Sequence, residues 1–389
     1  MKKILLKSRF RGWPLHSLYQ EMVKKSPEGF LIEILKENHS QDKGLTIDSK
    51  SANPFIRQLM YHIKPIPYML AQRIEKKYFQ GYDLVYASQH IIFNSEVPWI
   101  TDLEFANAFA GYGSLNFVKN IIQKQLELDQ CKFILPWSNW SKQTLLNSID
   151  CKNIKDKIQV IHYTVSPKKF FRKKHEKVNF LFVGSSNVRN IQNIKFKSLK
   201  EVILDFQNIS QKYDNIELTI RSYITPELKK ITSNNPKITV IEKFLSKEQL
   251  NQLFINADVF VLPSHETYGI ALLEAMSFKL PIIALNVYDI SEIVLDHENG
   301  LLIKPHQKIN YYTKNGTPAD YSIKFVKNLE KYSFHIIEQL EKFFSEIIED
   351  DSLRGKMAEN SRKIIEEGNL SLSKRNDKLA TVFESALKK

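Results

Sequence analysis

The stretch His265-Glu266-Thr267-Tyr268-Gly269-Ile270-Ala271-Leu272-Leu273-Glu274-Ala275-Met276 holds two glutamates, Glu266 and Glu274, eight positions apart. The segment before it, 257–263, is short, apolar and closed by a proline, which predicts a buried parallel strand. Helical periodicity resumes at about Gly269. Glu266 is therefore expected on a loop at the carboxyl end of a strand, where open α/β sheets bind ligands, and Glu274 about a turn and a half inside the next helix.

The chemistry of this arrangement suits a nucleotide sugar. The first turn of a helix has backbone N–H groups without helical partners, and these attract a phosphate. Two neighbouring carboxylates are good acceptors for the hydroxyls of a ribose or a sugar. Either glutamate alone is more simply explained as a solvated surface residue, but the pair in this apolar context favours a site. The candidate phosphate-binding amides are those of Tyr268, Gly269, Ile270 and Ala271.

The pair of glutamates resembles the E-x7-E element of retaining glycosyltransferases of family 4. The match runs almost position by position from Leu250 to Pro305, is looser over 179–389, and is weak in the N-terminal half. The resemblance implies a GT-B fold, in which two Rossmann-like domains with parallel sheets face each other and a C-terminal helix crosses back to the first domain. We therefore expect an α/β protein of this fold.

Length and composition agree with two globular domains. The chain has 389 residues, of which 43% are hydrophobic and 25% charged. Cys131 and Cys151 are too few for a disulfide framework, so a reducing, cytoplasmic location is expected. The start is too short in apolar residues for a signal peptide, and no run approaches the roughly 18 apolar residues of a membrane span. No metal-ligand pattern occurs, and we expect neither a metal nor another cofactor.

The positive charge is concentrated in the N-terminal half. Residues 1–177 hold 28 Lys and Arg against 16 Asp and Glu, whereas residues 178–389 hold 28 against 27. No nucleic-acid-binding motif accompanies this charge, so nucleic acid is not the expected partner. An anionic membrane face or an anionic acceptor fits better. Segments 56–64 and 68–79 place aromatic and basic residues at helical spacing, which is typical of an interfacial helix, although a core helix with a basic edge has the same pattern.

Alternating strand-like and helical segments predict parallel α/β domains. We expect an acceptor-binding domain over 1–165, a charged linker over 166–177, a nucleotide-sugar-binding domain over 178–372, and a helix over 373–389 that packs back on the first domain. Ser138 is expected to cap a helix, and Ser246 with Gln249 to form a capping box. The segments 3–7, 83–87, 98–101, 132–136, 180–184, 217–220 and 238–242 are predicted as strands. Segment 158–163 is expected to close the first domain, and 306–331 is predicted as an irregular polar insertion.

Further donor-site residues follow from the resemblance. Gly184 ends a strand at the position of the family's glycine turn, and the family places an arginine and then a lysine after it to hold the diphosphate. Ser185 stands at the arginine position, so Lys197 is the best match to the lysine and Arg189 could supply the missing cation; a solvated basic loop is the alternative for both. The backbone at Phe244 is where the family reads the nucleobase.

Fewer sequence signals identify residues on the acceptor side of the site. In the family, a residue facing the donor sugar, often a histidine, follows a strand that begins after a proline; here Glu104 falls at that position and Asp102 two residues earlier. A carboxylate there could accept a proton from the acceptor hydroxyl or orient it, and an exposed pair at a strand end is the alternative. His90, past another strand, is a second candidate, and Gly12 marks the first loop.

The expected activity is transfer of a sugar from a UDP-, GDP- or ADP-sugar to a hydroxyl of a glycan or lipid-linked acceptor, with retention at the anomeric carbon. Retention is implied by the resemblance alone. Two alternatives stay open: another GT-B enzyme, such as an epimerase or phosphorylase, and a nucleotide-sugar-binding scaffold without turnover.

Overall fold

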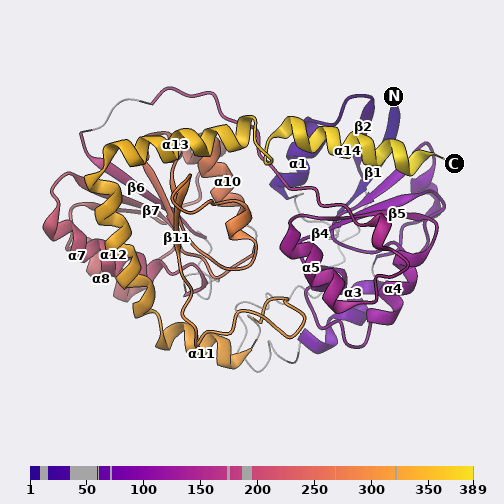
Figure 1. The fold of residues 1–389 in the computed structure, drawn as a ribbon, viewed down its shortest axis with the longest axis horizontal. Helices are drawn as coiled ribbons and strands as arrows, with labels where there is room; N and C mark the ends of the chain where they lie inside the picture. The colour runs from indigo at the N-terminus through magenta and orange to yellow at the C-terminus, as the bar shows by residue number, and fades with distance from the viewer. Residues whose placement is uncertain are drawn as a thin grey trace.

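Two separate parallel sheets form the two halves of the molecule (Figure 1). The computed structural model describes residues 1–8, 16–35, 59, 61–70, 72–172, 176–185, 195–267, 269–319 and 322–388. Within them, one sheet uses strands before residue 137 and the other uses strands between 178 and 303. The predicted α/β class with two facing parallel domains is confirmed.

The described residues of the first domain form a five-stranded sheet of order β2-β1-β3-β4-β5, with every pair parallel. The strands β1, β3, β4 and β5 are mostly buried, whereas the edge strand β2 buries only Phe30 and Ile32. The strands are β1 (Lys2–Lys7), β2 (Phe30–Ile34), β3 (Leu84–Ala87), β4 (Trp99–Leu103) and β5 (Cys131–Pro136).

The helices around this sheet are short. Ser138 caps α5 as predicted, because its hydroxyl accepts a hydrogen bond from the Ser141 amide at 3.0 Å. The α-helices are α1 (Ser17–Lys24), α3 (Pro65–Leu70), α4 (Lys119–Glu127) and α5 (Asn139–Ser148); the 3-10 helices are η1 (Lys76–Phe79), η2 (Ala106–Ala110) and η3 (Lys155–Lys157).

The second domain has a six-stranded parallel sheet in its described residues, of order β11-β10-β9-β6-β7-β8. Gly300 begins β11 because β10 leaves no room for a side chain: a Cβ there would lie 2.2 Å from the Ile282 carbonyl oxygen. The strands are β6 (Val178–Val183), β7 (Ile216–Arg221), β8 (Ile238–Ile241), β9 (Val259–Leu262), β10 (Ile282–Leu285) and β11 (Gly300–Ile303).

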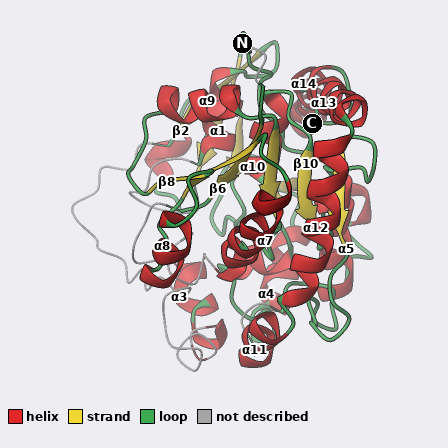
Figure 2. Ribbon diagram, turned by 90° about the vertical axis from the view of Figure 1, so that its left-hand side faces the viewer, coloured by secondary structure: helices red, strands yellow, loops and turns green. Residues whose placement is uncertain are grey.

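Helices pack on both faces of the second sheet (Figure 2). The predicted capping box is present at α9, where Ser246 and Gln249 exchange side-chain and backbone hydrogen bonds. The helices are α7 (Leu199–Lys212), α8 (Pro226–Ser233), α9 (Lys247–Asn256), α10 (Ile270–Ser277), η4 (Ile290–Glu292), α11 (Ile323–Lys331), α12 (Phe334–Glu349), α13 (Asp351–Glu366) and α14 (Leu372–Leu387).

The last helix joins the two domains. In Figure 1, α13 lies along the second domain and α14 continues across to the first. The Phe383 ring of α14 packs edge-on against Phe30 of β2 at 5.1 Å, so the helix completes the core of the first domain. The predicted crossing of the C-terminal helix is therefore confirmed.

Two local predictions were wrong. Segment 306–331 is not irregular throughout, because α11 occupies its end with one buried face. The stretch 68–79 does not form one helix: α3 ends at Leu70 and a 3-10 turn follows. No described helix has both the length and the apolar character needed to cross a bilayer.

Candidate functional site

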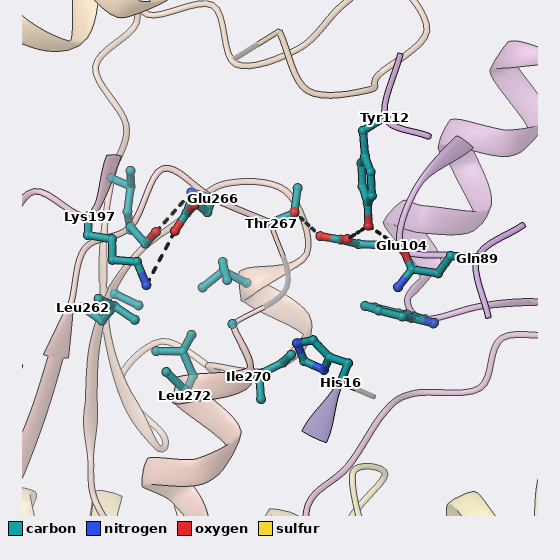
Figure 3. Close-up of a pocket in the computed structure, with 17 residues that line it drawn as sticks. His16, Gln89, Glu104, Tyr112, Lys197, Leu262, Glu266, Thr267, Ile270 and Leu272 are labelled. Atoms are coloured by element: carbon teal, nitrogen blue, oxygen red, sulfur yellow. Dashed lines mark hydrogen bonds and ion pairs between the residues drawn. The ribbon is translucent and has the colours of Figure 1, made fainter. Parts of the chain in front are cut away.

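A cavity of about 360 Å³ lies between the two domains. Figure 3 shows residues of both domains facing it, with Lys197 and Glu266 on one side and Glu104, Gln89 and Tyr112 on the other. The cavity is lined by His16, Gln89, Glu104, Tyr112, Trp137, Lys197, Leu262, Ser264, Glu266, Thr267, Gly269, Ile270, Ala271, Leu272, Ala284, Leu285 and Ile290.

The carboxyl ends of strands place these residues. β9 ends at Leu262 and leads directly into the loop that carries Glu266 and Thr267. β4 ends at Leu103, so Glu104 is the first residue beyond the first sheet. Open α/β sheets bind ligands at the carboxyl ends of their strands. Because these ends of the two sheets face each other, both sheets contribute residues to the same cavity.

Lys197 and Glu266, both predicted from the sequence, meet in the cavity. Lys197 Nζ lies 3.6 Å from Glu266 Oε2, and about a fifth of each side chain is exposed. The Glu266 amide also donates to Ser264 Oγ at 3.2 Å, which fixes the start of the loop. A cation and a carboxylate held side by side can bind an anionic group and a hydroxyl of the same ligand.

The amino terminus of α10 forms the floor of the cavity beside this pair. Gly269, Ile270 and Ala271, whose amides were predicted to bind a phosphate, all line it. Gly269 has no room for a side chain, because a Cβ would lie 2.6 Å from Cδ1 of Leu272. Tyr268, the fourth predicted residue of this turn, lies outside the described residues.

Hydrogen bonds of the buried His265 ring hold the start of the Glu266 loop in place. Its Nδ1 lies 2.7 Å from the Tyr311 hydroxyl and its Nε2 lies 3.0 Å from Ser198 Oγ. Burial lowers the pKa of His265 to about 3, so the ring is neutral, and one ring nitrogen donates while the other accepts. The His265 amide also donates to the Phe196 carbonyl at 2.6 Å, which ties the glutamate loop to the segment bearing Lys197.

Glu104 brings the first domain into the site. Its Oε1 accepts a hydrogen bond from the Thr267 hydroxyl of the second domain. The Tyr112 hydroxyl lies 2.5 Å from Glu104 Oε2 and 2.5 Å from Gln89 Oε1. Glu104, which was predicted to face the donor sugar, thus lines the same cavity as Glu266, and its carboxylate is oriented by side chains from both domains.

Asp102 does not face the cavity, which corrects its prediction as a catalytic residue. It is 1% exposed, because it still belongs to β4 while Glu104 lies beyond the strand. Hydroxyls of three tyrosines donate to its carboxylate, from Tyr19 at 3.0 Å, from Tyr86 at 3.0 Å and from Tyr163. Burial raises the pKa of Asp102 in spite of these hydrogen bonds.

His90 is also corrected, because its side chain is fully buried and Nδ1 lies 2.9 Å from the Ser88 carbonyl oxygen. Its neighbour Gln89 lines the cavity instead. Gln89 has a φ of 59°, uncommon for a residue with a side chain, and its amide donates to Asp102 Oδ1 at 2.7 Å. Asp102 therefore supports the cavity wall through the backbone of Gln89.

Three further predicted donor residues lie outside the cavity lining. Glu274 is half-buried in α10, where burial raises its pKa against the opposing charges of Lys168 and Lys247. The Phe244 side chain is 84% exposed. Gly184 is buried at the end of β6, where a Cβ would lie 2.5 Å from Ser222 Oγ. Gly12 and Arg189 fall outside the described residues.

Several cavity residues were not predicted from the sequence. Thr267 lies inside the glutamate stretch and Gln89 next to His90, so their neighbourhood was recognised but not their role. His16, Tyr112 and Trp137 carry no local signal, because only the fold brings their loops to the crevice. Nowhere in the described part of the chain do three or more His, Cys, Asp or Glu side chains gather as a metal site would require.

Comparison with known proteins places the second domain in a family. Residues 177–314 match the family model of glycosyl transferases group 1. A sulfoquinovosyl transferase of Arabidopsis thaliana is 36% identical over 75 residues, which cover 19% of this chain and 14% of that protein. The chain spans less than half the length of the curated relatives it matches.

Solved structures extend the likeness to both domains. A sucrose-phosphate synthase from Thermosynechococcus elongatus has a TM-score of 0.62 at 14% identity, over 99% of this chain and 98% of that one. The Anabaena HepE protein, solved with UDP and glucose, has a TM-score of 0.59 at 13% identity, over 99% and 100%. Residues 177–314 thus form a group 1 glycosyltransferase domain, in a chain that has the two-domain GT-B fold.

Proposed function

We propose that the chain transfers a sugar from a nucleoside diphosphate sugar to a hydroxyl of a glycan or glycolipid acceptor, with retention at the anomeric carbon. The observation that carries the proposal is the shared cavity, where the α10 turn, Lys197 and Glu266 oppose Glu104 across the domain boundary. A protein of the same fold binds UDP and glucose. Retention is supported only by the resemblance of the stretch from Glu266 to Glu274 to the E-x7-E element of retaining glycosyltransferases of family 4.

On the donor side, each group has a separate role. The amides of Gly269, Ile270 and Ala271 bind the distal phosphate, and Lys197 stabilises the charge of the leaving diphosphate. Glu266 accepts hydrogen bonds from hydroxyls of the donor sugar. Glu274, deeper in α10, is assigned to the ribose hydroxyls of a UDP-, GDP- or ADP-sugar.

In the transfer step, the acceptor oxygen forms a bond to the anomeric carbon while the bond from that carbon to the phosphate oxygen breaks. The electron pair of the broken bond goes to the phosphate, and the hydroxyl proton passes to the same leaving oxygen on the front face of the sugar. Glu104 orients the acceptor hydroxyl, and its own carboxylate is held by Tyr112 and Thr267. No covalent intermediate on Glu266 is involved.

A two-stage assay tests the proposal. UDP-, GDP- and ADP-sugars are first screened for thermal stabilisation of the protein, and those that bind are then tested for release of the nucleoside diphosphate with and without candidate glycans. We expect Glu266→Ala and Glu274→Ala to abolish turnover, while Glu298→Ala, an exposed glutamate of the same domain, leaves it unchanged. Binding without any turnover would indicate a scaffold, and a trapped glycosyl adduct on Glu266 would exclude the front-face mechanism.

We further propose a cytoplasmic enzyme whose basic first domain contacts an anionic membrane surface. Phe117, Ile121 and Leu128 are exposed along and beside α4, at spacings that share one helix face. Lys124 is exposed at the edge of that face, and Lys119 is exposed at the start of α4. An apolar stripe on a helix that also carries exposed lysines suits a bilayer interface with anionic headgroups.

Vesicle sedimentation tests this contact. The protein should sediment with vesicles that contain phosphatidylglycerol and not with pure phosphatidylcholine, and less at high salt than at low salt. Lys119→Glu with Lys124→Glu should abolish sedimentation, whereas the matched pair Lys324→Glu with Lys327→Glu in the second domain should not. Equal recovery with neutral and anionic vesicles would refute the contact.

A further inference from the structure

The amino terminus of α5, in the first domain, is capped by a carboxylate from the second domain. The amides of Asn139 and Trp140 donate to the two oxygens of Glu292, at 2.8 Å and 2.9 Å. The Asn139 side-chain amide adds a third hydrogen bond, at 3.0 Å. Glu292 thereby satisfies two of the N–H groups that a helix leaves without helical partners.

In this contact the carboxylate caps a helix by accepting from backbone amides, and does not pair with a charged side chain. Ser138 already caps α5 from its own domain by accepting from the Ser141 amide, so Glu292 supplies the cap for the two preceding amides. A carboxylate at a helix amino terminus also interacts favourably with the helix dipole. The helix can obtain this second cap only when the two domains are in contact.

A second contact lies beside the first. The Trp140 indole packs against the Tyr288 ring at 5.2 Å, and its Nε1 donates to the Gly316 carbonyl at 3.2 Å. Gly316 belongs to the loop 309–319, whose Tyr311 holds His265 beneath the Glu266 loop. The first turn of α5 is therefore connected, through this loop, to the donor side of the cavity.

Both partners of this contact are close in sequence to residues that line the cavity. Trp137, three residues before Trp140, lines the cavity from the first domain. Ile290, two residues before Glu292, lines it from the second. Separating Glu292 from α5 would move two opposite walls apart, and with them Glu104 from Thr267.

We propose that Glu292 is a positioning residue for the transfer reaction, which closes the cleft by capping α5 across the domain boundary. Glu292 does not touch the reacting atoms. It stabilises the closed arrangement in which the donor wall and Glu104 face each other. Its effect on turnover rests on the proposed function, whereas its effect on closure does not.

Small-angle X-ray scattering measures closure without any substrate. Glu292→Ala and Glu292→Gln should each increase the radius of gyration, because the open-to-closed ratio rises by roughly tenfold when a charged cap at a helix terminus is lost. Glu298→Gln, a charge removal on an exposed residue of the same domain, should leave it unchanged. The fluorescence of Trp140 is obtained by subtracting, for the wild type and for each Glu292 variant, the spectrum of the same protein carrying Trp140→Phe. This emission should shift to longer wavelength in Glu292→Ala as the indole becomes hydrated.

Nucleotide binding and turnover distinguish positioning from a folding defect. UDP, GDP and ADP contact only the second domain in the proposed site, so Glu292→Ala should keep the nucleotide affinity within about twofold while kcat falls in proportion to the closed fraction of the molecules. An unchanged radius of gyration together with unchanged Trp140 emission would overturn the proposal. If none of the nucleotides binds, the proposed function fails, but scattering and emission still decide the role of Glu292.

Discussion

Replacing Asp205 by Asn should remove a pH-dependent loss of stability from the second domain. Asp205 lies on α7 and is 0% exposed, and neither of its carboxylate oxygens has a hydrogen-bond partner in the described structure. Burial, and then the charge of Glu341 on α12, raise the pKa of Asp205 from 3.8 to about 7. The folded protein therefore holds this proton more tightly than the unfolded chain does.

The sign and size of the effect follow from that difference. A raised carboxyl pKa contributes stability that is fully present below pH 3.8 and is lost as the pH rises through about 7. Between these values the free energy of unfolding falls by about 1.4 kcal/mol per pH unit, or about 4 kcal/mol in all. From pH 5 to pH 8 the wild-type protein should thus lose about 3 kcal/mol through this residue alone.

Urea unfolding at pH 5, 6, 7 and 8 measures the effect. Asp205→Asn lowers the free energy of unfolding at every pH if its amide finds no partner. The informative quantity is therefore the fall in the free energy of unfolding from pH 5 to pH 8, which should be about 3 kcal/mol smaller in the variant than in the wild type. Glu341→Gln should reduce the slope in part, because it removes the neighbouring charge. Asp129→Asn, at an exposed site, is the matched control. Parallel pH profiles for the wild type and Asp205→Asn would refute the reasoning.

Two further predictions concern packing and the site. Gly300→Ala should lower the free energy of unfolding by about 1–3 kcal/mol, because its Cβ would overlap the Ile282 carbonyl. Gly355→Ala in α13 places its Cβ in open space and should raise the free energy of unfolding by up to about 1 kcal/mol. Equal effects of the two substitutions in urea unfolding would contradict this reasoning. Tyr311→Phe removes the hydroxyl that holds His265 and should lower donor turnover about tenfold, with a stability loss of about 1 kcal/mol; unchanged turnover would show that the Glu266 loop needs no such support.

Local patterns were sufficient for many elements. The capping box of Ser246 and Gln249 and the cap at Ser138 were predicted because they involve residues three positions apart, whose geometry a helix start determines by itself. Buried parallel strands such as β9 were recognisable from short apolar runs.

The site was predicted where its residues are neighbours in sequence and missed where they are not. Glu266 and the α10 turn follow from one strand-loop-helix pattern, and Lys197 from a resemblance to a family motif. Nothing local distinguishes Glu104 from Asp102, yet one faces the cavity and the other is buried under three tyrosines. The difference arises because β4 ends between them, which depends on pairing with β3 and β5.

The sequence by itself determined that the chain alternates strands and helices, that its positive charge lies in the N-terminal half, and that two glutamates flank a helix start at a strand end. These properties depend on residues close in the chain. Only the tertiary structure decided which side chains oppose that helix start and what holds the two domains together. Glu104 meets Thr267, and Glu292 caps α5, across more than 150 residues of sequence. Such contacts join residues that are distant in sequence and lie in different domains, so no local pattern can encode them.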